Sequence, residues 1–403
     1  MIGSGYAGYW LEIDLTTQKA AWNPLPEAYR QQGLSGKALA AQLLWERTKG
    51  SEKAFSEENL LIIASSLLTG SGVPGANRFD IASLSPKDDL PAFSNCGGNL
   101  GTALKKAGCD ALLIKGKAPD PQWIEITDGE VRFRDARSLW GMRTGPCREQ
   151  LLQNRDAASL CIGPAGENLV KFASILADGH STGRAGLGAV LGWKNLKAIT
   201  VSGTGEIPFR DPEKLAENNN RWHAKLQERN QKSFSEGRCQ ECPLHCSKHH
   251  RQENPVLEEL GLDAVAAEAA YIWATEQSLD TENFYEKLAL GTDLGLLLER
   301  MPHTTKSKAG KRRDASREQI AKAFSFLPEA EETADFCTNF AEGISACGQC
   351  LFTVKALESG AAEMPLVRAL ECVTGQSWDL ERLLSLGTYS RNLEKQLNKR
   401  FQK

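Results

Sequence analysis

Short apolar runs alternate with glycine and proline in the first half of the chain, and runs bounded by turn residues predict β-strands. The five clearest are Trp10–Leu15, Leu60–Ser65, Ala111–Lys115, Trp123–Ile126 and Ala198–Val201. From Asp211 onwards, apolar residues instead recur with the helical period of about 3.6 residues. This second pattern predicts a helix beginning at Pro212 and helices over Leu257–Thr275, Glu282–Glu299 and Leu380–Arg400.

The two patterns meet near residue 205, where we predict a domain boundary. The predicted fold class is α+β, with a β-rich N-terminal domain over residues 1–205 and a mostly α-helical C-terminal region over residues 206–403. The basic stretch Met301–Ser316 interrupts the helical pattern. It lacks the interleaved aromatic residues typical of nucleic-acid binding, and we interpret it as a solvated linker.

The composition excludes several classes of protein. The 403 residues include 48 Lys and Arg and 51 Asp and Glu, a net charge of −3, which is unlike the basic surface that binds nucleic acid. No apolar run approaches the ~20 residues of a membrane span. The segment Met1–Asp14 lacks the features of a secretory signal. We therefore expect a cytoplasmic protein that has no membrane span and does not bind nucleic acid.

Five of the eleven cysteines are spaced as metal ligands are. Cys239, Cys242 and Cys246 form C-x2-C-x3-C, and Cys347 and Cys350 form C-x2-C. In a reducing compartment, clustered thiols indicate a metal rather than disulfides. The three sulfurs of the first group can bind one face of a metal centre, so a fourth ligand must come from elsewhere.

The identity of that fourth ligand decides the kind of site. With Cys350, the four thiolates fit either a [4Fe-4S] cluster or a structural zinc. With His249 or His250, zinc is the better interpretation, and pairing the two C-x2-C groups would resemble a zinc ribbon. Spacing alone leaves iron-sulfur and zinc open.

Two glycine-rich segments of the first half each contain an arginine. Gly183–Lys194 offers backbone N–H groups, an arginine and a lysine to an anion, but it lacks the ending of a nucleotide P-loop. Taken alone, it is best interpreted as a tight structural turn. Gly75–Phe79 and Ser94–Gly98 repeat the combination of arginine and glycine. Together the segments indicate a large anionic ligand.

The chain resembles the aldehyde ferredoxin oxidoreductase family, tungsten or molybdenum enzymes that hold the metal between two pterin dithiolenes beside a [4Fe-4S] cluster. The motifs that carry the resemblance occur in family order and cover almost the whole first half: Asp14–Thr17, Leu68–Arg78, Ser94–Gly98, Leu104–Gly108, Ile114–Ala118, Ile162–Asn168 and Gly183–Ala198. The resemblance implies that the β-rich domain forms a base for the pterin cofactor. The helical segments then close over it and supply the cluster ligands.

The resemblance also implies individual roles. Arg78 and Arg184 match arginines that contact the pterin phosphates, and the carbonyls of Asn95 and Ala185 match ligands of the magnesium ion that bridges those phosphates. The neighbouring glycines that let the cofactor approach are Gly97, Gly98, Gly183 and Gly186. The cluster ligands are Cys239, Cys242, Cys246 and Cys350.

The second half departs from the family pattern. Two pterin-binding acids are replaced by Thr292 and Ser345, whose hydroxyls can form hydrogen bonds but weaker ones than a carboxylate forms. Gln349 stands where the family has leucine. The chain is shortened around residues 302–333, where the family supplies much of its substrate pocket. Glu258 or Glu259 matches the family's catalytic glutamate, although acids at a helix start are commonly simple dipole partners.

The resemblance implies two functions. In the first, a tungsten or molybdenum bis-pterin site oxidises an aldehyde or related small organic substrate, and the cluster passes electrons to ferredoxin or an iron-sulfur partner subunit. In the second, a non-catalytic relative serves as an electron-transfer subunit, a cofactor carrier or a structural partner of a full-length homologue. A homo- or hetero-oligomer is compatible with both.

Overall fold

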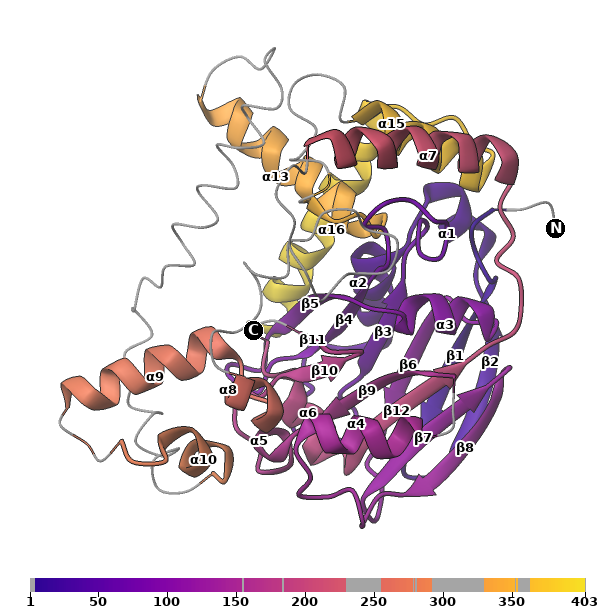
Figure 1. The fold of residues 1–403 in the computed structure, drawn as a ribbon. Coiled ribbons are helices and arrows are strands. Elements are labelled where there is room, and N and C mark those ends of the chain that lie inside the picture. Colours follow the sequence, from indigo (N-terminus) through magenta and orange to yellow (C-terminus); the bar gives the residue numbers. More distant parts are fainter. Residues whose placement is uncertain are drawn as a thin grey trace.

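The computed structural model describes residues 4–153, 156–182, 185–229, 255–277, 279, 281–291, 330–351, 353 and 363–402. Two six-stranded sheets dominate the N-terminal half, and helices dominate the C-terminal region (Figure 1). The predicted α+β class is therefore confirmed. All five strands predicted from the sequence are present, within two residues of their predicted bounds.

The first sheet has the strand order β2-β1-β6-β3-β4-β5. Its β1 and β6 are parallel, and the other neighbouring strands are antiparallel. The strands are β1 (Tyr9–Asp14), β2 (Lys19–Pro24), β3 (Leu61–Ser65), β4 (Arg78–Leu84), β5 (Pro91–Gly97) and β6 (Ala111–Lys115). The helices of this part are α1 (Glu27–Gln32), α2 (Gly36–Arg47) and α3 (Leu100–Lys106).

The second sheet has the order β11-β10-β9-β12-β7-β8, with β12 and β7 parallel. Its strands are β7 (Gln122–Thr127), β8 (Glu130–Asp135), β9 (Ala158–Ile162), β10 (Ile175–Ala177), β11 (His180–Ser181) and β12 (Leu196–Ser202). The helices between them are α4 (Thr144–Leu152), α5 (Pro164–Glu167) and α6 (Leu187–Trp193).

The described helices of the C-terminal region form two groups. The helices α7 (Pro212–Arg229), α13 (Ala330–Ala346), α15 (Glu363–Thr374) and α16 (Leu380–Phe401) lie together, with α7 against α15 and α13 against α16 and α2 (Figure 1). The helices α8 (Pro255–Leu260), α9 (Ala264–Glu276) and α10 (Phe284–Ala289) share an apolar core with α5, which α10 contacts directly.

Two apolar cores flank the first sheet, because successive side chains of a strand point to opposite faces. On one face, residues such as Leu11 and Phe79 join α3 and the second sheet. On the other face, Leu39 of α2 belongs to a core with Phe340 of α13 and Leu386 of α16. This second core combines both halves of the chain, so the helical region is anchored directly on the first sheet.

Two helix predictions are corrected by the structure. The single helix expected over Leu257–Thr275 is two helices, because Gly261 adopts a left-handed φ of +72° and the Asp263 side chain caps α9 by accepting from the Ala266 amide at 2.9 Å. The helix expected from Glu282 ends at Ala289, since Gly291 has a φ of +65°. Residues 292–299 lie outside the described part. The predicted helices beginning at Pro212 and over Leu380–Arg400 are confirmed.

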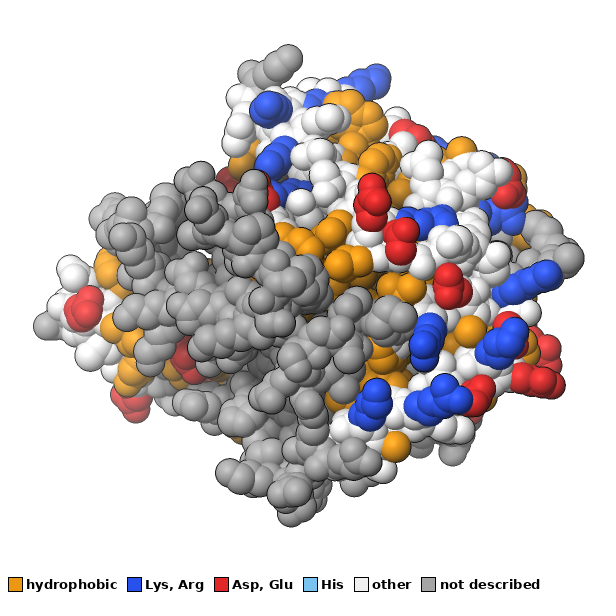
Figure 2. All heavy atoms as spheres, turned by 90° about the horizontal axis from the view of Figure 1, so that it is seen from above, with side chains coloured by type: hydrophobic (Ala, Val, Ile, Leu, Met, Phe, Trp, Pro, Cys, Tyr) orange, Lys and Arg blue, Asp and Glu red, His pale blue; other side chains and the backbone are white. Residues whose placement is uncertain are grey.

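Acidic and basic side chains intermingle over the described surface that Figure 2 shows, in keeping with the sequence's near balance of charges. No helix among the described residues is long and apolar enough to cross a lipid bilayer.

Candidate cofactor-binding site

One edge of the first sheet brings together two residues that the resemblance assigns to the cofactor. Arg78 begins β4, and Asn95 lies near the end of β5. Their antiparallel register places Arg78 opposite Gly97 and Asp80 opposite Asn95. The Arg78 guanidinium donates to Asn95 Oδ1, and its Nη2 donates to the Asn95 carbonyl oxygen at 3.3 Å. Residues 17 positions apart therefore form one polar group.

Asp80 orients this group from within the protein. Asn95 Nδ2 donates to Asp80 Oδ1 at 3.1 Å, which leaves Asn95 Oδ1 facing the arginine. The Asp80 side chain is buried, and desolvation raises its pKa to about 7, although Asn95, Lys37 and Arg78 each act to lower it. Because Asp80 follows Arg78 by two residues on one strand, both side chains lie on the same face of the sheet.

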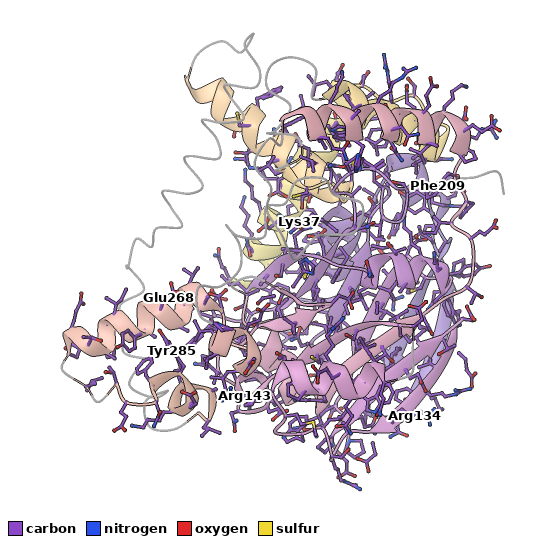
Figure 3. The ribbon with its side chains drawn as sticks, viewed as in Figure 1. Lys37, Arg134, Arg143, Phe209, Glu268 and Tyr285 are labelled. Atoms are coloured by element: carbon purple, nitrogen blue, oxygen red, sulfur yellow. The ribbon has the colours of Figure 1, made fainter. Side chains whose placement is uncertain are left out.

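Lys37 connects this edge to the helical region. It is the second residue of α2, and its Nζ donates to Glu342 of α13 at 2.8 Å and to Glu394 of α16 at 2.7 Å. Burial lowers the pKa of Lys37, but the two carboxylates outweigh burial and the net pKa is raised. Figure 3 shows Lys37 where α2 meets α13 and α16.

The glycine turn after β5 joins the two sheets. Gly98 has a φ of +115°, and a Cβ placed on it would lie 3.2 Å from the Asp178 side chain. Asp178 in turn accepts from the Asn99 and Ser159 amides, both at 2.8 Å. Gly97 is buried at the end of β5. The glycine turn that is predicted to admit a cofactor is thus held in place by Asp178 of the second sheet's β10–β11 turn.

In the described part of the segment Gly183–Lys194, the glycines allow close packing. Gly183 and Arg184 lie outside the described residues. A Cβ on Gly186 would lie 2.1 Å from the Lys171 carbonyl oxygen, and one on Gly192 would lie 1.9 Å from the Gly166 carbonyl oxygen. These contacts favour the structural-turn interpretation of this segment. Ala185, whose carbonyl is predicted to bind magnesium, is half-buried beside the core between the sheets.

Lys194, at the end of the same segment, cannot serve an anion as the sequence suggested. Its side chain is fully buried, and Nζ donates to the Gly116 carbonyl oxygen at 2.9 Å. Burial lowers its pKa to about 7, which the carboxylates of Glu57, Glu58 and Asp14 only partly offset. Its hydrogen bond connects the motif Gly183–Ala198 to the motif Ile114–Ala118.

The predicted cluster ligand Cys350 lies against the loop that precedes Arg78. Its amide donates to the Gly75 carbonyl oxygen at 3.0 Å. A Cβ on Gly75 would lie 2.5 Å from Thr353 Cγ2, so glycine is required for this approach. The other predicted ligands, Cys239, Cys242 and Cys246, lie outside the described residues. The described residues contain no group of three or more potential metal ligands.

The geometry of Cys347 argues against the zinc-ribbon arrangement. Its side chain is fully buried in the core beneath α13, where burial raises the pKa of the thiol to about 12. Cys350 is partly exposed. Because Cys347 is enclosed in the apolar core and Cys350 is not, Cys350 is the better-placed ligand of the two. His249 and His250 lie outside the described residues.

The structure does not bring the predicted catalytic glutamates to the Arg78 group. Glu259 on α8 pairs with Arg143 at 2.8 Å, and Arg143 also lies 3.7 Å from Glu286. The carbonyl oxygen of Glu258 accepts from Thr144 Oγ1. Figure 3 shows Arg143 well apart from Lys37. A catalytic role for either glutamate stays a prediction.

The donor set at the sheet edge fits the phosphate end of a pterin cofactor. It combines a guanidinium, a backbone carbonyl with a second lone pair, and a glycine turn, which suit a phosphate with its counter-ion. Ser345, predicted to replace a pterin-binding acid, is half-buried in the last turn of α13, and Thr292 lies outside the described residues. Three buried side-chain atoms have no hydrogen-bond partner where the first sheet meets the end of α13: Ser66 Oγ, Asp80 Oδ2 and Gln349 Oε1.

Sequence reasoning missed Asp80 and Lys37. The alternation of Arg78 and Asp80 along one strand was an available signal for the first. Nothing local marks Lys37, whose carboxylate partners lie 305 and 357 residues away in the chain.

Comparison with known proteins supports the assignment of the first half. Residues 10–203 match the family described as aldehyde ferredoxin oxidoreductase, N-terminal domain. The tungsten-containing aldehyde ferredoxin oxidoreductases of Pyrococcus furiosus and Thermococcus kodakarensis are each 37% identical over 215 residues, which is 52% of this chain and 36% of those proteins. The aliphatic sulfonate oxidoreductase WOR-like subunit of Pyrococcus furiosus is 36% identical over 230 residues. The chain thus matches about a third of the length of these relatives.

The fold of the whole chain is similar to a solved structure. The active-site complex BamBC of benzoyl coenzyme A reductase, bound to 1,5-dienoyl-CoA, matches with a TM-score of 0.79 and 21% sequence identity. The match covers 100% of this chain and 90% of that one, so the likeness of fold includes the helical region. Residues 10–203 of this chain thus match the N-terminal domain of the aldehyde ferredoxin oxidoreductase family.

Proposed function

We propose that the chain is a redox protein of the aldehyde ferredoxin oxidoreductase type. In this proposal, the chain would hold a tungsten or molybdenum bis-pterin, which would supply the oxidation of an aldehyde or related small substrate. It would also hold a [4Fe-4S] cluster, which would supply electron transfer to ferredoxin or an iron-sulfur partner subunit. The observation that carries the proposal is the Arg78–Asn95–Asp80 group, which the fold assembles within the segment that matches the family.

The roles of the chain's own residues follow from their chemistry. Arg78 and, by resemblance, Arg184 would neutralise the phosphates, and the carbonyls of Asn95 and Ala185 would hold the magnesium ion. Asp80 keeps the Asn95 amide, and through it the guanidinium, in one orientation. Cys350, with Cys239, Cys242 and Cys246, would hold the cluster. When bound, the pterin metal supplies two-electron oxidation and the cluster supplies one-electron transfer.

A non-catalytic relative is the second candidate, and two observations favour it. Ser345 stands in place of a carboxylate, and Glu259 is engaged by Arg143. Such a protein would keep the cluster and the phosphate-binding half and serve as an electron-transfer subunit, a cofactor carrier or a structural partner of a full-length homologue.

Metal quantification combined with EPR distinguishes these functions. The protein is purified anaerobically from a host that makes the pterin cofactor, and iron, zinc, tungsten and molybdenum are counted per chain. About four irons, as one cubane cluster requires, together with stoichiometric tungsten or molybdenum, support the oxidoreductase. The same iron without either metal supports the non-catalytic relative. Zinc without iron contradicts both.

Two cysteine variants form a matched pair for the metal count and the EPR spectrum. Cys350→Ser should lose the signal of the reduced cluster, because serine is a poor substitute for a thiolate ligand of iron. Cys347→Ser should keep that signal, since Cys347 is buried in the apolar core.

A further inference from the structure

Gln349 is a buried polar residue at a position where the family has leucine, and it lies beside the predicted cluster ligand Cys350. Its side chain is only 2% exposed. A buried amide costs free energy unless it is hydrogen-bonded, so its partners carry information.

The hydrogen bonds of Gln349 link the cysteine turn to the β-rich domain. Nε2 donates to the Pro74 carbonyl oxygen at 2.8 Å and to Thr353 Oγ1. Thr353 Oγ1 itself donates to the Cys350 carbonyl oxygen at 2.6 Å. The amide therefore contacts the loop before Arg78 on one side and the turn of Cys350 on the other.

The chemistry of the partners fixes the orientation of the amide. The Pro74 carbonyl can only accept. The single hydroxyl proton of Thr353 is used on Cys350, so Thr353 also accepts from Gln349. Both contacts require Nε2, and Oε1 is left buried without a partner.

Two further contacts close the same junction. The Cys350 amide donates to the Gly75 carbonyl oxygen at 3.0 Å. Gly75, at a φ of +76°, would bring a Cβ to 3.3 Å from the Cys350 Cβ. The loop and the turn are therefore in direct contact at the residue predicted to ligate iron.

We propose that Gln349 is a positioning residue for the cluster: its amide clamps the turn of Cys350 to the Pro74–Gly75 loop and so fixes one ligand relative to the phosphate-binding edge. This inference rests on the proposed cluster. It assigns a purpose to a departure from the family pattern, because leucine could make neither hydrogen bond.

The test compares four variants of the full chain. Gln349→Leu and Gln349→Met both remove the donor to Pro74, Thr353→Val removes the relay hydroxyl, and Thr353→Ser keeps it. In metal-free protein, hydrogen exchange at the Cys350 amide should be about tenfold faster in the first three variants, which corresponds to about 1.4 kcal/mol, the scale of one or two net hydrogen bonds. Thr353→Ser should exchange like the wild type.

The second readout is the cluster itself in reconstituted, reduced protein. The three disrupting variants should show altered EPR g-values and lose iron to a chelator about tenfold faster than wild type, a factor of the same size as the exchange effect. Exchange within twofold of wild type, or an unchanged EPR spectrum with wild-type iron retention, would overturn the inference. Wild-type protein that takes up no iron would instead refute the proposed cluster, while exchange would still show whether the clamp exists.

Discussion

The two halves of the chain share close glycine packing and differ in their buried charges. In the β-rich half, motif glycines bring backbone against backbone, as Gly192 does with Gly166, and Lys197 and Glu167 form an ion pair whose side chains are 0% and 4% exposed. In the helical region, a Cβ on Gly387 of α16 would lie 1.8 Å from the Asn339 carbonyl oxygen of α13. That region is also held by capping side chains such as Asp263 and by apolar packing onto the first sheet. The half that matches the family is thus the half in which a fully enclosed pair of charges adds to the glycine packing.

Breaking the buried ion pair should have the largest effect. Lys197 also donates to the Met142 carbonyl oxygen at 2.9 Å, and both charged groups are almost fully buried. Lys197→Met leaves Glu167 buried without its cation, so unfolding free energy should fall by about 3–5 kcal/mol, measured by denaturant titration. Adding Glu167→Gln should recover most of the loss. If the single and double variants were equally unstable, the buried charge would not be the cause.

Glycine packing provides a matched pair of substitutions. Gly192→Ala should destabilise by about 3 kcal/mol, because the new Cβ would lie 1.9 Å from a backbone oxygen that cannot move freely. Gly145→Ala, on α4 with nothing within 4 Å, should instead stabilise by about 0.5–1 kcal/mol. Equal melting temperatures for the two variants would contradict the distinction.

The buried amine of Lys194 predicts a pH dependence. Its pKa falls from 10.5 to about 7 on folding, so between these values the unfolded chain binds more protons and stability rises with pH. The slope contributed by this one group approaches about 1.4 kcal/mol per pH unit. Lys194→Met should remove that contribution from a series of unfolding titrations at pH 7–10. An unchanged slope would mean that the amine is not titrating there.

Removing a helix cap in the other half should have the smallest effect. Asp263→Ala removes the acceptor for the Ala266 amide and should cost about 1 kcal/mol. Asp263→Asn, which keeps an acceptor oxygen, should cost less than half as much. A loss as large as that of Lys197→Met would erase the contrast between the two regions.

Local sequence patterns were sufficient for the strands but not for every helix or site. Leu61–Ser65 is a continuous apolar run, and such a run predicts a buried strand directly. The break at Gly261 has a local signal that the apolar periodicity outweighed: a glycine that ends one helix, followed two residues later by the N-cap Asp263 of the next. For the segment Gly183–Lys194, the sequence could not separate packing from anion binding, since a lysine that could serve an anion can equally serve a neighbouring carbonyl, as Lys194 does.

Some residues of the candidate site could also be predicted from the sequence, and others could not. Arg78 and Asn95 were predicted through the family resemblance, and strand register explains why they meet. The alternation of Arg78 and Asp80 along one strand was a usable local signal. Lys37 acts through helices more than 300 residues away, so no local motif marks its role. The cysteine ligands were predicted from spacing and resemblance together. Of these four, the structure describes only Cys350, so their assembly into one site stays a prediction.

The central claim is that the Arg78 edge holds a phosphate-bearing pterin. The most direct measurement is the pterin content per chain, by fluorescence after oxidative release, in wild type, Arg78→Ala and the surface control Arg132→Ala, all expressed where the cofactor is made. Loss of a charge-assisted contact at the phosphates should lower retention by about tenfold or more in Arg78→Ala. Arg132→Ala should match the wild type. Equal pterin in all three proteins, or none in the wild type, would contradict the account.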